Sequence, residues 1–575
     1  PVRAVAAALA PRTRLHAPTT MRPKHGAAMR ALLAVADAGG DALGGDGWGD
    51  VLRCCSLWEL LTTVAGGAPS DASMFGVPAP TPAPAPRRSL FGRSVSTAAP
   101  AGPPPASVRD APLAPPPATV LLPPPGVLDA VNADAVDRVY VRSARLGADA
   151  AADFVAALAR VATDELATES PRVFSTSKIV DVAHFNMDRI RLVWSRLWAT
   201  LGDFFVGAGA HASLPVALYA VDALRQLASK FLERDELANY SFQTEFLRPF
   251  VGIVRGARRV EVRELAVRCL AQLASSRGPC IRSGWRSMFM AFTAAAGDES
   301  PTVVRLAFAA VERVVRDAFA SIADPEAAAF PDAVNCLVAF ANAAVPADVG
   351  LNAIAFLRFC ADRLAGGDVA DATGGRGDDG RDAGAGSLAP PQPHPDALRI
   401  RPAGTPTAAH STPPPLDDAR LYAWFPLLAG LSELAFDPRP DTRHAALEVL
   451  FGVLAAHGGA FTPAFWERVY TSALLPVFDH VRAGDARATT FAAPTGAGDG
   501  ADAWLYATAT RCLARTVDVA TAFWPATECL LPKLLDLLGG LARRPHAPLA
   551  GVGVAALARL VDAVGPLADA RAWGS

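Results

Sequence analysis

Residues 436–454 read FDPRPDTRHAALEVLFGVL, which joins a proline-rich turn to a helical pattern of apolar residues. The turn carries Asp437 and Pro438, and these residue types belong at a helix start, where Asp complements the dipole and Pro costs no hydrogen bond. After Arg443, apolar residues follow at positions i, i+1, i+4 and i+7, on one helical face. The first of them, Ala446, is small and allows close approach of a neighbouring helix. The stretch predicts one helix of a packed array rather than a catalytic site.

The same small-then-apolar pattern recurs along the chain. Its five copies are Ala220-Val221-Leu224-Leu227, Ala266-Val267-Leu270-Leu273, Ala307-Phe308-Val311-Val314, Ala446-Leu447-Leu450-Val453 and Ala556-Leu557-Leu560-Ala563. The first three are 46 and 41 residues apart, the spacing of HEAT or armadillo units. Arg263 and Arg443 each stand three residues before the Ala of their copy. The pattern predicts an all-α, HEAT/armadillo-like helical-repeat solenoid. An irregular helical domain is the alternative, because any amphipathic helix has such a face.

Three segments are too rich in Pro, Gly and Ala to offset the entropy of ordering them, and we expect disordered linkers there. The expected division is a disordered or truncated start at 1–20, a helical region at 21–65, a Pro/Ala-rich linker at 66–127, helical repeats at 128–364, a Gly/Asp/Pro-rich linker at 365–416, helical repeats at 417–483, a short linker at 484–502, and C-terminal helical repeats at 503–575. The sequence begins with Pro1 rather than Met, which favours a fragment of a longer protein.

Composition excludes several classes of function. The formal net charge of −2 provides no field for nucleic acid, and the excess of Arg over Lys fits coding bias. None of the eight cysteines forms a CxxC pair, so buried thiols of a cytosolic protein are expected rather than disulfides or a zinc site. The apolar run 204–221 is interrupted by Gly207 and Pro215, which argues against a membrane span.

The search for catalytic motifs finds no phosphate-binding loop, no H-E-x-x-H pair and no G-x-S-x-G elbow. The ten histidines are scattered, and those in helical segments have no second ligand at i+3 or i+4. No cofactor, metal site or enzymatic centre is therefore expected.

A partner surface is the remaining kind of site. The segment FNMDRIRLVWSRLW, residues 185–198, places arginines and tryptophans at helical spacing, and these residue types dominate interface hot spots. The alternative is that the tryptophans face the core and the arginines are solvated or paired. The candidate residues for this surface are Asn186, Arg189, Arg191, Trp194, Arg282 and Trp285. The residues expected to hold the repeats together are Arg263, Ala266, Asp437, Pro438, Arg443 and Ala446.

Several long blocks resemble one known family. FNMDRIRLVWSRLWATLGDFF, AVDALRQLASKFLERDELANYSFQTEFLRPF and VRCLAQLASSRGPCIRSGWRSMFMAF are similar to the large brefeldin A-inhibited guanine-nucleotide exchange factors for ARF GTPases (the Sec-seven/BIG group), in their regions downstream of the catalytic domain. WFPLLAGLSELAFDPRPDTRHAALEVLFGVL and LLDLLGGLARRPHAPLAGVGVAALARLV resemble later downstream regions. The resemblance covers about 21–64, 129–345, 418–483 and 503–565, in the family's order.

The resemblance implies the C-terminal regulatory and scaffold region of an exchange factor, acting in vesicle-mediated transport. The implied partners are small GTPases of the ARF/Rab type and the Golgi membrane surface, with a homodimer through family regions N-terminal to this sequence. The implied location is cytoplasmic and peripheral on Golgi and trans-Golgi network membranes. The family's catalytic domain has no counterpart in these residues, so exchange activity is not expected of this chain. The alternatives are an inactive Mon-two-like scaffold in endosome–Golgi trafficking and, less compatible with the blocks, an unrelated HEAT adaptor.

Overall fold

The computed structural model describes residues 22–65, 126–168, 171–189, 193–234, 242–324, 329–343, 347–366, 416–437, 439–478, 498–543 and 547–567. The chain divides into two compact units, Pro1–Leu227 and Ala228–Ser575. Within the described ranges every regular element is a helix, so the prediction of an all-α repeat fold is confirmed.

Among its described residues, unit 1 contains six α-helices, the first part of a seventh that crosses the unit boundary, and three 3₁₀ turns. They are α2 (Pro23–Ala38), η1 (Gly40–Ala42), α3 (Gly44–Ala65), η2 (Leu128–Ala130), α5 (Ala133–Val141), η3 (Arg142–Arg145), α6 (Ala148–Leu166), α7 (Phe174–Asn186), α8 (Trp194–Gly209) and α9 (Leu214–Leu232). Helix α6 is central, because α3, α7 and α8 all pack against it. Its Phe154 is fully buried and meets the ring of Trp48 from α3 edge-on, with centroids 4.7 Å apart.

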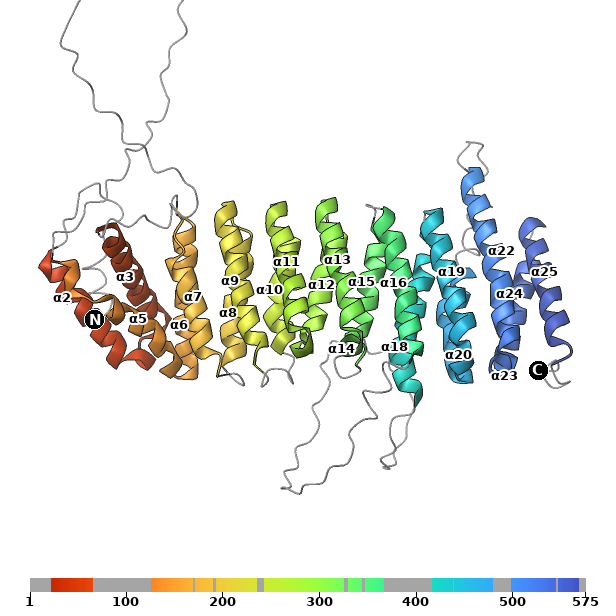
Figure 1. Ribbon diagram of the computed structural model, residues 1–575, viewed down its shortest axis with the longest axis horizontal. Helices are drawn as coiled ribbons and strands as arrows, with labels where there is room; N and C mark the ends of the chain where they lie inside the picture. The colour runs from red at the N-terminus through yellow and green to blue at the C-terminus, as the bar shows by residue number, and fades with distance from the viewer. Residues whose placement is uncertain are drawn as a thin grey trace, which may run out of the picture. The chain divides into compact units, whose positions relative to one another are not determined.

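Unit 2 continues as successive helices. They are α10 (Phe242–Gly256), α11 (Val260–Arg277), η5 (Gly278–Cys280), α12 (Gly284–Ala296), α13 (Pro301–Asp317), α14 (Phe319–Ala323), α15 (Phe330–Asn342), α16 (Ala347–Ala365), α18 (Leu416–Leu434), α19 (Pro440–His457), η6 (Gly458–Ala460), α20 (Pro463–Val469), the π-helical η7 (Tyr470–Leu474), α22 (Gly498–Ala522), α23 (Trp524–Thr527), η8 (Glu528–Leu530), α24 (Leu531–Ala542) and α25 (Ala547–Val564). Each packs mainly on its chain neighbour or the next helix but one, as in α10 with α12 and α11 with α13 (Figure 1). Such nearest-neighbour packing is the property of a solenoid.

The apolar repeat positions lie in the core. All four residues of the copies beginning at Ala220, Ala266, Ala307 and Ala446 are buried. In the fifth copy Ala556 and Leu560 are buried, but Leu557 and Ala563 are only half-buried. The reason is that α25 packs on α22 and α24, whereas no described helix follows it.

The turn before α19 is held by polar contacts. Asp437 is buried, and its Oδ1 accepts hydrogen bonds from the backbone N–H of Arg439 at 2.8 Å and from its Nε at 2.9 Å. Arg439 Nη1 and Nη2 donate to the carbonyl oxygens of Ala343 (2.7 Å) and Ala341 (2.6 Å) at the end of α15. Arg443 is buried, and its Nη1 donates to the Asp437 carbonyl oxygen at 3.0 Å. These contacts join two helices whose sequences are far apart; Pro438 lies outside the described residues.

The expected start at 1–20 and most of the three expected linkers also lie outside the described residues. Helix α22 begins at Gly498, inside the expected linker 484–502. Composition there shifts to ADAWLYATA, whose Ala and Leu favour a helix, and the helix therefore begins before the predicted boundary. Among the described helices, none is both long and apolar enough to span a bilayer.

Candidate functional site

A basic pocket lies in unit 1. It is a cavity of about 760 Å³, walled by α2, η1, the first turns of α3, the segment around η2, α5 and η3. Helices α2, α3 and α5 lie at the red-to-orange part of the ribbon in Figure 1. Asn132 starts α5, because its Oδ1 accepts a hydrogen bond from the N–H of Asp134 at 3.3 Å. We call this cavity the arginine pocket.

Four arginines line the arginine pocket: Arg30 from α2, Arg138 from α5, and Arg142 and Arg145 from η3. Arg142 forms an ion pair with Asp37. The side chains of the other three are exposed and have no carboxylate partner among the described residues. Sequence reasoning missed this cluster. The signal was present in VDRVYVRSAR, residues 136–145, where Arg138, Arg142 and Arg145 follow an i, i+4, i+7 spacing.

The floor of the pocket is tightly packed. Trp48 is 2 % exposed and its ring rests against Phe154. Gly40 lies so close to this floor that a Cβ atom there would come within 2.7 Å of Leu146 Cδ2 and 3.7 Å of Trp48 Cζ2. Asp41 accepts a hydrogen bond from the N–H of Gly147 at 2.7 Å, which joins η1 to the start of α6. A larger residue at position 40 would require the Leu146 side chain to move.

Two of the predicted surface residues support the pocket wall from behind. Asn186 is buried, and its Nδ2 donates to Ser143 Oγ at 3.0 Å and to the Val182 carbonyl oxygen at 2.9 Å. Arg189 donates through Nη1 to Asn186 Oδ1 at 3.3 Å and through Nη2 to the Leu146 carbonyl oxygen at 2.6 Å. Asn186 and Arg189 therefore fix η3, the turn that carries Arg142 and Arg145.

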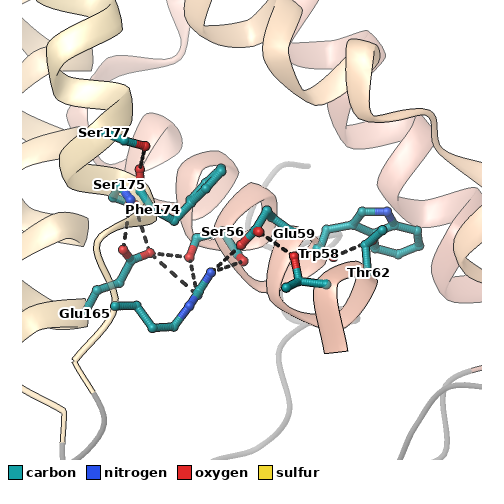
Figure 2. Close-up of polar contacts among 10 residues, drawn as sticks. Ser56, Trp58, Glu59, Thr62, Glu165, Phe174, Ser175 and Ser177 are labelled. Atoms are coloured by element: carbon teal, nitrogen blue, oxygen red, sulfur yellow. Dashed lines mark hydrogen bonds and ion pairs between the residues drawn. The ribbon is translucent and has the colours of Figure 1, made fainter. Parts of the chain in front are cut away.

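A second polar cluster joins α3 to α6 and to the start of α7 (Figure 2). Buried Glu165 of α6 accepts hydrogen bonds from Ser56 and, at 2.8 Å, from the Ser175 hydroxyl. Arg172 donates to Ser56 Oγ at 2.9 Å and to Glu59 Oε2 at 2.6 Å. Burial raises the pKa of Glu165, although its hydrogen bonds and the charge of Arg172 favour the ionised form. The cluster holds α3 and α7 on α6.

The neighbouring candidate Trp194 is not on this wall. Trp194 is buried at 1 % exposure and stacks on Trp198, with ring centroids 5.8 Å apart. Its position in α8 matches the alternative in which the tryptophans of this segment face the core. Arg191 lies outside the described residues, so its place on a partner surface stays a prediction.

Arg282 and Trp285 lie in unit 2, Arg282 in the turn before α12 and Trp285 in the first turn of that helix. Trp285 is fully buried and its Nε1 donates to Ser321 Oγ at 3.1 Å. Arg282 is half-exposed and pairs with Asp324 at 3.5 Å. The turn itself is fixed by Gln243, whose Oε1 accepts the Arg282 N–H at 2.8 Å and whose Nε2 donates to the Cys280 carbonyl oxygen at 2.9 Å. Arg282 thus remains a candidate for a partner contact, while Trp285 packs in the interior.

The chemistry available to the arginine pocket is anion binding. Guanidinium groups hold fixed planar donors that match phosphate and carboxylate oxygens.

Across the described ranges, no group of His, Cys, Asp and Glu side chains is placed to hold a metal ion. The six cysteines that are buried are Cys54, Cys55, Cys269, Cys336, Cys360 and Cys512. Burial raises the pKa of the Cys54 thiol to about 12, so it is not a ready nucleophile.

Two family models match parts of the chain. Residues 230–313 match the model described as Mon2/Sec7/BIG1-like, HDS, and residues 404–549 match the C-terminal region of Mon2 protein. An engineered protein of known structure is similar with 12% identity and a TM-score of 0.23, covering 74% of this chain and 89% of its own, a likeness too weak to bear on the fold.

Curated relatives match over nearly the whole chain. Brefeldin A-inhibited guanine nucleotide-exchange protein 3 of Arabidopsis thaliana is 40% identical over 98% of this chain and 32% of its own length. Protein 2 of the same plant is 39% identical over 98% of this chain and 32% of its own. Protein 1 of Homo sapiens is 32% identical over 81% of this chain and 23% of its own. The chain spans about a third of the length of its plant relatives. Over nearly its whole length the chain is therefore similar to one part of the brefeldin A-inhibited guanine nucleotide-exchange proteins, as the sequence blocks predicted.

Proposed function

We propose that this chain is the regulatory and scaffold region that follows the catalytic domain of an ARF guanine-nucleotide exchange factor. One observation carries the proposal: relatives named as exchange proteins match 98% of the chain, while the family model over residues 230–313 is that of the HDS region. A helical-repeat fold supports it, because stacked repeats present extended surfaces for partners rather than enclosed catalytic sites.

The proposed role is to bind small GTPases of the ARF/Rab type and to bring the exchange factor to Golgi membranes as a peripheral, cytoplasmic protein. The half-exposed Arg282 and the positions Arg189 and Arg191 remain the candidate contacts. Purified chain should retain GTP-loaded ARF or Rab proteins in a pull-down and retain the GDP-loaded forms less. Equal retention of both nucleotide states contradicts the proposed sensing of activated GTPases.

Exchange itself is not expected of these residues. The chain, added to ARF carrying a fluorescent nucleotide, should leave the release rate at its spontaneous value. A full-length relative serves as the positive control. Release above the spontaneous rate, proportional to the chain's concentration, contradicts this part of the proposal.

A second candidate function rests on the match of residues 404–549 to the C-terminal region of Mon2. It is a scaffold without exchange activity that acts in endosome–Golgi trafficking. Reading the coding sequence upstream of Pro1 separates the two: an open frame for an exchange domain supports the first, and an in-frame stop supports the second.

A further inference from the structure

We propose that the arginine pocket binds a compact ligand with several phosphate groups, of the inositol phosphate class, either free or as the headgroup of a lipid. The proposal concerns the cavity between α2, η1, α5 and η3 and does not depend on exchange activity or on a GTPase partner.

The charges of the pocket are not balanced within the described residues. Arg30, Arg138 and Arg145 come from two parts of the chain that are about 100 residues apart in sequence, yet the fold places them around one cavity. Arg30 has only a long contact, 3.4 Å from Nη1 to the Ala130 carbonyl oxygen. Three like charges around one cavity repel each other, and an anion relieves that repulsion.

The acidic side chains of the pocket are already engaged. Asp37 pairs with Arg142, and Asp41 accepts the hydrogen bond from Gly147. The bond from Gly147 leaves the charge of Asp41 in place, so the lining carries four arginines against two aspartates, and an incoming anion meets an excess of positive charge. One carboxylate would pair with only one of these guanidinium groups. A ligand with several phosphates can contact the guanidinium group of α2 and those of α5 and η3 together.

The size of the pocket fits a small molecule. Its volume of about 760 Å³ lies within the usual range of small-ligand sites. Leu33 and Trp48, both almost fully buried, also line the cavity beside the arginines. An extended nucleic acid is a poor occupant, because the chain has a net charge of −2 and no long basic face.

The walls are fixed before any ligand binds. Asn186 and Arg189 hold η3 by hydrogen bonds of 3.0 Å to Ser143 and 2.6 Å to the Leu146 carbonyl oxygen. Trp48, which is 2 % exposed, and Gly40, which lies against Leu146, form part of the packed floor. A site whose walls are already ordered loses less entropy on binding.

The test uses the full chain and its variant with Arg138→Ala and Arg145→Ala together. Both side chains are exposed and make no described ion pair, so folding should be unaffected. Arg313→Ala on α13 is the matched control, since Arg313 is likewise exposed and unpaired but lies in unit 2. Inositol trisphosphate is titrated calorimetrically; we expect saturable binding that weakens about tenfold or more in the double variant, from the loss of charge-assisted hydrogen bonds, and is unchanged in the control.

A vesicle sedimentation assay distinguishes a lipid headgroup from a free inositol phosphate as the ligand. Phosphatidylcholine vesicles with phosphatidylinositol bisphosphate are sedimented with the chain, and vesicles with unphosphorylated phosphatidylinositol are the control. Binding to the first alone, lost in the double variant, supports the lipid headgroup. Binding of free trisphosphate without vesicle binding supports the soluble form. No saturable binding of either probe, equal binding by the double variant, or binding of polyglutamate in place of trisphosphate overturns the proposal.

Discussion

Asp298 and Asp437 accept equivalent hydrogen bonds in two different repeats. The Oδ1 of each takes the backbone N–H two residues later, that of Ser300 or Arg439, and both distances are 2.8 Å. Each Asp stands three residues before the Pro that begins a repeat helix, Pro301 or Pro440. The repeats thus share a turn in which Asp fixes the backbone and Pro starts the helix.

Arg263, in the preceding repeat, binds the Asp of one of these turns. Its Nε and Nη2 donate to Asp298 at 2.6 and 3.0 Å, and its Nη1 donates to the Ala257 carbonyl oxygen at 2.8 Å. The Asp298 side chain is only 5 % exposed, so Arg263→Ala leaves a buried carboxylate unpaired and should lower the free energy of unfolding by about 3 kcal/mol. Urea unfolding followed by circular dichroism measures it. Arg313→Ala should cost almost nothing, and equal small losses in both variants contradict the prediction.

Asp437 should make the stability of unit 2 sensitive to acid. Burial raises the pKa of Asp437, but hydrogen bonds and charge from Arg439 outweigh it, and the net pKa is lowered. The carboxylate therefore stabilises the fold above its ordinary pKa, and this contribution is lost as the pH falls through the folded-state pKa. Asp437→Asn should be less stable at neutral pH and should differ less from wild type in acid. A constant difference across the pH series is the contrary outcome.

Glu165 should make the free energy of unfolding fall as the pH rises, which is the opposite of the effect of Asp437. Because burial raises its pKa in the folded chain, its contribution is fully present below the ordinary pKa and is lost as the pH rises through the folded-state pKa. Glu165→Gln should remove this decline, and Arg172 keeps its 2.6 Å contact with Glu59 in the variant. Unfolding free energies from acid to neutral pH test it, with Asp153→Asn, an exposed carboxylate of the same helix, as control. A variant that declines as steeply as wild type contradicts the role of Glu165.

The sequence predicts helical faces well but not what covers them. Spacing identified Ala266, Ala446 and their apolar partners because the helical period is local. Trp194 shows the limit: its helical face was evident, but only tertiary packing decides whether that face meets solvent or another helix. The bonds from Arg439 to Ala341 and Ala343, and the pocket between Arg30 and Arg145, join segments far apart in sequence. No local pattern contains those contacts.

Asn186 and Arg189 should control the shape of the arginine pocket. Asn186→Ala removes the bond to Ser143, and Arg189→Glu removes the bond to the Leu146 carbonyl oxygen, so each should loosen η3 and cost about 1–3 kcal/mol of stability. Amide hydrogen exchange across residues 142–146 should accelerate in both variants. Arg138→Ala is the control, since its exposed side chain bonds nothing in the described chain. The contrary outcome is that Arg189→Glu weakens the GTPase-dependent recruitment of the chain to membranes while the amide hydrogen exchange rates and the melting temperature stay at wild-type values. That outcome makes Arg189 a partner contact and its role in the pocket wall secondary.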